Sequence, residues 1–169
     1  MFYEFFIKLI GLGILATLFF SPLDLTYQNK VLLVKGQLNE PITYEIQELV
    51  KKGYKFKTKL YLSVIVNNQK VLSKIIIKEL TNKENYWYLE NKKIKFENIN
   101  KIMGTYKAAF ENVDLNDNDE IVVFLLADII EDKEFTKSTN LETESLWNYH
   151  KPTRKDFYIY EKGKLVEKL

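Results

Sequence analysis

The sequence predicts an α+β fold that is mainly β: an antiparallel β-sandwich or sheet of about seven strands with two amphipathic helices, preceded by an N-terminal hydrophobic helix. Three observations predict this fold. Strand-like segments follow one another as direct hairpins, whereas a parallel sheet would need a helix between successive strands. Two other segments carry apolar residues at helical spacing. Residues 5–23 form an apolar run with a single charge.

Length and composition exclude several classes of protein. The 169 residues suit one domain of ordinary size. The 25 Lys+Arg and 23 Asp+Glu give a formal net charge of +2, which is too small to indicate a nucleic-acid partner. The chain has no Cys, so disulfides, thiolate metal sites and cysteine nucleophiles are impossible. We therefore expect no cofactor and no nucleic-acid partner.

The N-terminal run from Phe5 to Leu23 contains Lys8 as its only charge. As a helix with a rise of about 1.5 Å per residue it would just cross a bilayer. We expect residues 1–23 to anchor a single extracytoplasmic domain, residues 24–169, in the cell membrane, because Lys8 favours a cytoplasmic N-terminus. The alternative is a cleaved signal peptide and a secreted or periplasmic domain. The residues after the run lack the small pair that signal peptidase needs, which favours the anchor.

The domain is expected to begin with a strand from Tyr27 to Leu38. A short helix should follow, with Asn39 as its cap, Pro41 at its first position and Gly53 at its end. Its buried face would be formed by Ile42, Ile46, Leu49 and Val50.

Two β-hairpins are expected next. The segment from Tyr54 to Asn67 alternates apolar and polar residues, which predicts a half-buried strand, and Val71 to Leu80 is its partner. Lys57 and Lys59 fall on the polar face of this strand and are expected to be wet. The second hairpin is predicted to pair Tyr86–Leu89 with Ile94–Phe96.

The second half is predicted to contain the longer helix and the main core strand. Apolar residues at three- and four-residue steps predict a helix from about Asn98 to Asn112. The segment from Ile121 to Ile130 is apolar on both faces, which indicates a central strand covered on both sides, with Val123 and Leu125 fully buried. The remaining expected elements are a short helical turn from Leu141 to Asn148 and a last strand from Asp156 to Glu161.

The order of these elements also resembles a known family. A hydrophobic N-terminal segment and a first strand precede LNEPITYEIQELVKKGYKFKTKLYLSV; an aromatic hairpin, a helix, an apolar strand and LWNYHKP follow it. This arrangement is similar to an uncharacterised family of exported, anchored bacterial domains and covers most of residues 24 to 160. The resemblance implies a C2-like β-sandwich outside the cytoplasm, and it brings no functional residues.

The acidic loop between the longer helix and the core strand is the strongest metal-binding candidate. Asp114, Asn116 and Asn118 match the first three ligand positions of an EF-hand loop. The sixth position holds Asp119 instead of Gly and the twelfth holds Leu125 instead of Glu, so we favour a solvated turn without metal. A looser calcium site remains the alternative. Its candidate ligands are Asp114, Asn116, Asn118, Asp117, Asp119 and Glu120.

Other chemical groups have a structural interpretation that we favour. Trp147, Tyr149, His150 and Arg154 could bind an anion or a sugar, but aromatic residues before a proline usually pack a loop onto the core. The aromatic run Tyr86 to Tyr88 could form a recognition patch, although aromatics also suit one face of a hairpin.

Two charged groups could also act chemically. Asp128, Glu131 and Asp132 could serve as acid and base, but they are more typical of a strand end at the solvent. The lysine stripe of the first hairpin could attract anionic lipid headgroups or an acidic partner, yet such lysines also protect strands from aggregation, and we favour that role. Its members are Lys55, Lys57 and Lys59.

These observations predict a non-enzymatic, membrane-anchored extracytoplasmic domain that binds a protein or an envelope component through an exposed edge or loop face. A calcium- or lipid-binding C2-like module that uses the acidic loop is the alternative. An envelope hydrolase is the third hypothesis. The expected partners are the membrane, through Phe5 to Leu23, and a protein or envelope component.

Overall fold

The computed structural model of the chain describes residues 20–39, 41–42, 44–130 and 152–168. The described part is mainly β and consists of two antiparallel sheets and two short α-helices, which confirms the coarse prediction. The expected N-terminal helix and the expected turn from Leu141 to Asn148 lie outside the described residues.

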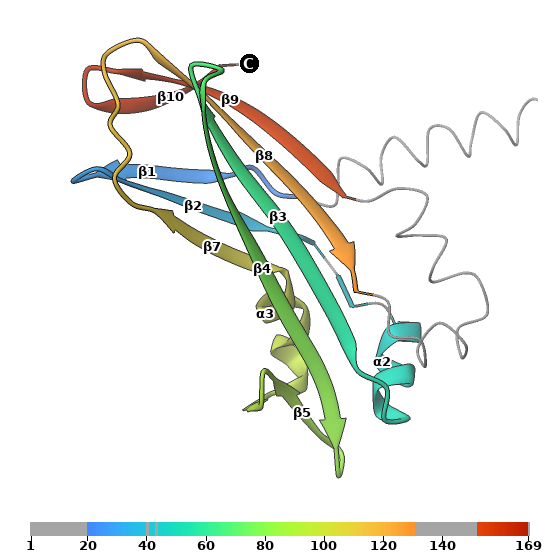
Figure 1. Cartoon of the computed structure of the whole chain (residues 1–169). Helices are drawn as coiled ribbons and strands as arrows, with labels where there is room; N and C mark the ends of the chain where they lie inside the picture. The colour runs from blue at the N-terminus through green and yellow to red at the C-terminus, as the bar shows by residue number, and fades with distance from the viewer. Residues whose placement is uncertain (1–19, 40, 43, 131–151, 169) are drawn as a thin grey trace, which may run out of the picture.

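The larger sheet has seven strands in the order β10-β9-β8-β3-β4-β5-β6, all antiparallel (Figure 1). Its strands are β3 (Phe56–Val66), β4 (Lys70–Lys83), β5 (Tyr86–Leu89), β6 (Lys92–Ile94), β8 (Asp119–Ile129), β9 (Thr153–Glu161) and β10 (Lys164–Lys168).

The smaller sheet has three strands in the order β1-β2-β7. They are β1 (Asp24–Gln28), β2 (Val31–Gln37) and β7 (Thr105–Phe110). The helices are α2 (Tyr44–Lys51) and α3 (Ile99–Gly104), and the 3₁₀ turn η1 (Phe96–Asn98) leads into α3. Figure 1 shows the small sheet beside the upper part of the large one and the helices near its lower end.

Two hydrophobic clusters stabilise these layers. The first lies between the sheets and contains Leu62 of β3, Leu125 of β8, Leu32 of β2 and Tyr106 of β7, each at most 1% exposed. The second lies under the helices, where Ile46 of α2 and Met103 of α3 are among the residues packed with strands β3 to β5. Both clusters use one face of the large sheet, so that face forms the core of the domain.

Five tight turns connect neighbouring strands, and each contains two successive residues with positive φ. Four of them have two residues, and the turn between β3 and β4 also includes Gln69. This backbone matches the type I′ turn, whose twist suits antiparallel hairpins and which favours Asn and Gly. Asn occurs in four of the five turns. They are Asn29-Lys30, Asn67-Asn68, Glu84-Asn85, Glu90-Asn91 and Lys162-Gly163.

One of these turns divides the expected first strand. We predicted one strand from Tyr27 to Leu38, but the chain turns at Asn29-Lys30 and forms the hairpin β1–β2. Because the turn contains no glycine, the apolar pattern of the segment predicted one uninterrupted strand. Lys162-Gly163 likewise adds strand β10, which the prediction did not include.

The expected helix from Asn98 to Asn112 is wrong in its second half. The helix α3 ends at Gly104, and the chain continues as strand β7. Tyr106, Ala108 and Phe110 are all buried, and this two-residue alternation belongs to a strand. The helix was predicted from large apolar residues three and four positions apart, and Ala108 was not among them.

The short helix α2 also begins later than predicted. Asn39 does not cap it, because its side-chain oxygen accepts a hydrogen bond from Ser21 (3.1 Å) and the helix begins only at Tyr44. Pro41 precedes the helix and is not its first residue. The apolar face was predicted correctly, since Ile42, Ile46 and Val50 are all buried.

The described fold includes residues 20–23, which lie before the expected start of the domain at residue 24. Phe20 is 4% exposed and forms a β-bridge with Leu38, and Leu23 packs against the core between the sheets. These residues therefore belong to the domain, although we had assigned them to the expected membrane span. The remainder of that span, Phe5 to Phe19, lies outside the described residues.

Candidate functional site

The best candidate for a functional surface is the face of the large sheet that points away from the small sheet, here called the outer face. It is formed by alternate residues of five strands, because successive side chains of a strand point to opposite faces. The cross-strand register places twelve large or apolar members on this face. They are Lys59, Tyr61, Ile65, Val71, Ile75, Ile77, Val122, Phe124, Leu126, Phe157, Ile159 and Val166.

The outer face is apolar and exposed. Val71, Ile75 and Ile77 on β4 are 62%, 56% and 50% exposed, and Phe157 on β9 is 44% exposed. No element of the described chain covers this face. The prediction that Ile121 to Ile130 is covered on both sides therefore fails for the described part, although Val123 and Leu125 are fully buried as predicted.

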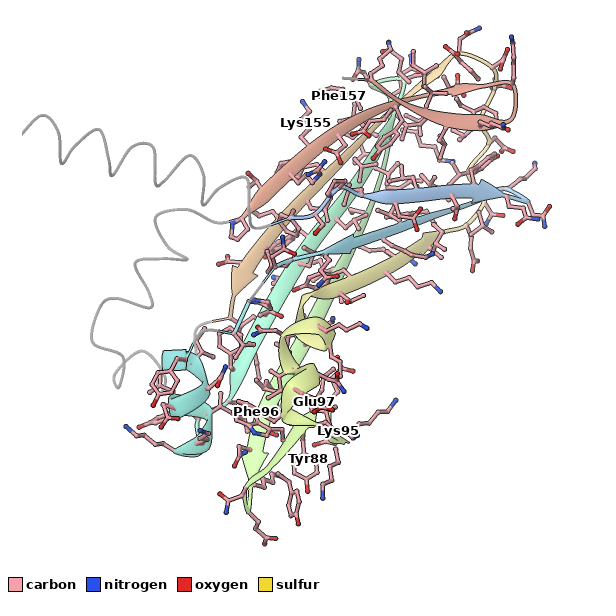
Figure 2. The ribbon with its side chains drawn as sticks, turned by 180° about the vertical axis from the view of Figure 1, so that it is seen from behind. Tyr88, Lys95, Phe96, Glu97, Lys155 and Phe157 are labelled. Atoms are coloured by element: carbon pink, nitrogen blue, oxygen red, sulfur yellow. The ribbon has the colours of Figure 1, made fainter. Side chains whose placement is uncertain are left out.

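Lysine side chains lie across the aromatic residues of the outer face. The Lys59 amine is 4.5 Å from the ring centre of Tyr61, and the Lys155 amine is 4.9 Å from that of Phe157. Figure 2 shows Lys155 and Phe157 together on β9. Such contacts cover apolar surface with lysine stems while the charges stay in water.

The lysines predicted to be wet are in fact half-buried. Lys57 and Lys59 are both only partly exposed, and the Lys57 amine lies 3.2 Å from the Glu79 carboxylate. Lys55 also approaches Glu79, at 3.8 Å. The lysine stripe is therefore partly neutralised by β4, which favours its structural role over lipid attraction.

A pocket of about 370 Å³ lies at one end of the outer face. Lys168 holds Glu120 at its rim, with 3.1 Å between the amine and the carboxylate. Burial and the neighbouring Asp156 raise the pKa of Tyr158 in the pocket wall, so this phenol stays protonated at ordinary pH. The pocket offers an apolar wall and a polar rim, an arrangement suited to binding. It is lined by Asn68, Glu120, Ile121, Val122, Phe157, Tyr158 and Lys168.

The side chains of the acidic loop make structural contacts in different directions. Asp114 pairs with Lys30 at 2.7 Å, and the Asp117 carboxylate accepts a hydrogen bond from the backbone N–H of Lys162 at 2.6 Å. Asp119 accepts hydrogen bonds from the Asn116 backbone and from the Asn67 side chain. The loop therefore connects three turns of the domain.

The remaining candidate ligands of the loop are also separated. Asn118 has φ of 71° and donates its backbone N–H to Tyr160, while Glu120 is paired with Lys168. Among the described residues, no three His, Cys, Asp or Glu side chains converge in a group that could hold a metal ion. This arrangement supports the interpretation of the loop as a turn between β7 and β8.

Arg154 is the one described member of the predicted anion or sugar site. Its Nε donates to the Asp156 carboxylate at 2.7 Å, and Nη1 donates to the Phe20 carbonyl at 3.4 Å. Asp156 is 8% exposed, and the bond from Arg154 to Phe20 ties β9 to the segment before β1. Trp147, Tyr149 and His150 lie outside the described residues.

The aromatic hairpin divides its side chains between the core and the solvent. Trp87 is 6% exposed and lies 5.8 Å from Phe96, whereas Tyr86 is 49% exposed with the Lys93 amine 3.1 Å from its ring centre. Figure 2 places Tyr88 and Phe96 at the opposite end of the domain from Phe157. Trp87 and Leu89 of the hairpin thus belong to the second core cluster, whereas Tyr86 and Tyr88 lie in register with the outer-face residues of β4.

The two remaining acid–base candidates, Glu131 and Asp132, lie outside the described residues. Asp128 is paired in register with Lys59 on the outer face.

Lys78 is the most perturbed lysine of the described chain. It lies on the core side of β4, and its amine donates to the carbonyls of Ile102, Met103 and Thr105 at the end of α3. Burial lowers the pKa of this amine to about 8. The carbonyls at a helix C-terminus are a favourable place for a cation, so Lys78 joins β4 to α3.

This burial predicts a pH-dependent stability. Between pH 8 and about 10.4 the unfolded chain holds the Lys78 proton more tightly than the folded chain, so the contribution of Lys78 to stability rises with pH across that window. The partial exposure of the amine limits this rise in the free energy of unfolding to about 1 kcal/mol. We expect the Lys78→Met variant to lack the rise. Urea unfolding of both proteins at pH 7 and pH 10 measures the difference. Identical pH dependence in the two proteins would contradict the burial of this amine.

Comparison with family models, curated proteins and solved structures found no match for the chain. The similarity to the exported bacterial family thus stays a hypothesis. No helix of the described part is both long enough and apolar enough to cross a membrane. Function must therefore be argued from the geometry of the outer face.

Sequence reasoning missed the outer face, although a signal for it was present. Val71, Ile75 and Ile77 alternate with Leu72, Ile76 and Lys78 on one strand, so β4 carries apolar residues on both of its sides. The core strand β8 has the same property. Two strands with this pattern, one on each side of β3, indicate a sheet whose second face needs a cover.

Proposed function

We propose that the chain is a non-enzymatic, membrane-anchored extracytoplasmic domain that binds a protein partner through the outer face. The observation that supports this function is the exposure of Val71, Ile75, Ile77 and Phe157 on one continuous sheet face. Exposed apolar surfaces of this kind are typical of protein–protein interfaces. The amines of Lys59 and Lys155, which lie over Tyr61 and Phe157, supply polar groups for such an interface.

The buried residue Phe20 limits where the proposed anchor can end. Phe20 is buried in the core, and the Phe20 carbonyl accepts a hydrogen bond from Arg154. In the sequence, the apolar run continues up to Phe20 without a polar linker. An anchor ending there would hold the domain against the membrane and restrict how the outer face meets a partner.

Site-specific crosslinking in living cells tests this function. A photoreactive amino acid would replace Ile75 or Phe157 on the outer face, or the exposed Lys107 on β7 as a matched control. We expect the full-length chain to crosslink to one and the same protein from positions 75 and 157, and not from position 107.

A second variant shows whether the crosslink depends on the surface. Ile75→Asp should abolish crosslinking from position 157, because it puts a charge into the apolar contact, whereas Lys107→Asp should leave it unchanged. The thermal midpoint of each variant confirms that it is folded. Crosslinks confined to the chain itself, or equal crosslinking from position 107, would overturn the proposed function.

A further inference from the structure

Strand β4 has an open edge. Lys70 to Leu80 pair with β3 on one side, but β5 pairs only with Leu80 to Lys83 on the other. In the described part of the chain, no strand pairs with the segment from Lys70 to Glu79 on the side opposite β3. A long strand edge of this kind is a template for another strand.

The backbone groups that face this edge can be identified. The Glu79 carbonyl accepts a hydrogen bond from the N–H of Glu90, on the β5 side of the strand. In a strand, residues two apart direct their N–H and C=O groups the same way. The groups of four residues therefore face the open edge. These residues are Val71, Ser73, Ile75 and Ile77.

The two sides of the edge differ in chemistry. On the outer face, Val71, Ile75 and Ile77 present an apolar row that is at least half exposed. On the core face, the inward positions carry Lys70, Lys74 and Lys78 at intervals of four residues. A strand added here would therefore meet apolar side chains on one side and ammonium groups on the other.

None of the three lysines forms an ion pair with a described residue, although Glu90 and Asp114 lie near enough to interact electrostatically with Lys78 and Lys70. The Lys70 amine donates to the Asn112 carbonyl at 3.1 Å, and the Lys74 amine lies 5.6 Å from the ring centre of Phe110. Lys78 donates to carbonyls at the end of α3. Their positive charges are thus gathered along the edge with only neutral acceptors in contact.

We propose that the open edge of β4 binds an extended segment of the partner protein in which apolar and acidic residues alternate. This inference rests on the proposed function and specifies how the partner is recognised. The apolar residues of the added strand contact the row of Val71, Ile75 and Ile77. Its acidic residues neutralise the three lysines. Addition of a strand supplies main-chain hydrogen bonds, and the alternating side chains supply specificity.

The charge pattern selects against a second copy of this chain. Pairing of β4 with β4 of another molecule would bring together six lysines from core-side rows that contain no acidic residue, and like charges between strands are destabilising. Lysines are a common means of preventing contacts between identical edges. The same lysines favour an acidic strand, so they exclude one partner and recruit another.

Hydrogen exchange on the full-length chain in detergent micelles tests the inference. The probe is a capped seven-residue peptide of alternating Val and Glu, and the control peptide alternates Val and Lys. We expect saturating Val/Glu peptide to slow exchange at the amides of Val71, Ser73, Ile75 and Ile77 by about tenfold, because these amides become hydrogen-bonded. The Val/Lys peptide should leave exchange unchanged.

Two variants separate strand addition from unspecific charge attraction. Ile75→Pro removes an N–H that faces the edge and not β3, so the variant should fold but lose the protection. Lys74→Glu should weaken binding of the Val/Glu peptide and give protection by the Val/Lys peptide. If Ile75→Pro does not fold, the reversal of peptide preference in Lys74→Glu remains a sufficient test.

Three results would overturn the inference: no protection by either peptide, equal protection by both, or protection that appears without peptide and increases with protein concentration. The last result would assign the edge to a second copy. Crosslinking from the outer face in cells is independent of these measurements. Specific crosslinks without slowed hydrogen exchange at the β4 edge would contradict only this inference. The absence of crosslinks would contradict the proposed function.

Discussion

Replacement of Gly104 by Ala is expected to destabilise the domain by about 3 kcal/mol, the upper end of the usual cost of overpacking. Gly104 ends α3, and its carbonyl accepts a hydrogen bond from the N–H of Leu38 at 2.8 Å. A Cβ atom at Gly104 would overlap the carbonyl oxygen of Leu38 and lie 3.2 Å from the carbonyl carbon. Both atoms belong to the backbone, so neither can rotate away as a side chain would.

Gly53→Ala is the matched control. Gly53 has φ of 97° and no atom within 4 Å of the place that a Cβ would take. Its replacement costs only backbone strain, about 1–2 kcal/mol. Urea unfolding followed by the fluorescence of the buried Trp87, which lies in the cluster next to α3, compares the two variants. If Gly104→Ala loses less unfolding free energy than Gly53→Ala, then Gly104 does not lie against the backbone of Leu38.

Gly104 also explains why the sequence predicted this region incorrectly. Helical spacing from Ile99 through Tyr106 to Phe110 suggested a single helix, and a glycine inside it looked merely unfavourable. The actual reason for the glycine is a close crossing with a segment about 65 residues away in sequence. Local periodicity carries no information on such long-range contacts, so the transition from α3 to β7 could not be predicted from it.

Elements whose pattern is set by one strand and its own turn were predicted well. Strand β3 alternates as expected, with Leu60, Leu62 and Val64 buried, and Asn67-Asn68 forms the turn to β4. The alternation and the turn both lie within one hairpin, so the sequence contains all that is needed. The small sheet, by contrast, joins β2 to β7 across most of the chain, and nothing local indicates that pairing.

The candidate site also depends on long-range pairing that local sequence patterns do not reveal. The sequence suggested functional loops, because acidic and aromatic residues cluster there. In the described structure, Asp114, Asp119 and Arg154 are instead engaged in contacts that hold the fold together. The outer face and the β4 edge arise only when five strands are placed side by side. Their apolar residues are separated by many others in the sequence, so composition and motif alone could not assemble them.

The second large effect is expected at Leu125, where replacement by Ala should cost about 2–5 kcal/mol. Leu125 is fully buried on β8, directly opposite Leu62 of β3 and Arg154 of β9. One of its methyl carbons would lie 3.5 Å from a Cβ placed at Gly36 of the small sheet. Leu125 therefore fills the space between the two sheets, and a cavity there cannot collapse without moving both of them.

Lys57→Ala is the control for this prediction, because Lys57 lies on the opposite face of the neighbouring strand. It is half-buried and paired with Glu79, and such a pair contributes at most about 1 kcal/mol. Urea unfolding of both variants should therefore give a clearly larger loss for Leu125→Ala. Equal losses would mean that the face of β8 with Leu125 is not the core face. In that case Val122 and Phe124 would belong to the interior, and the outer face proposed as the binding surface would be lost with them.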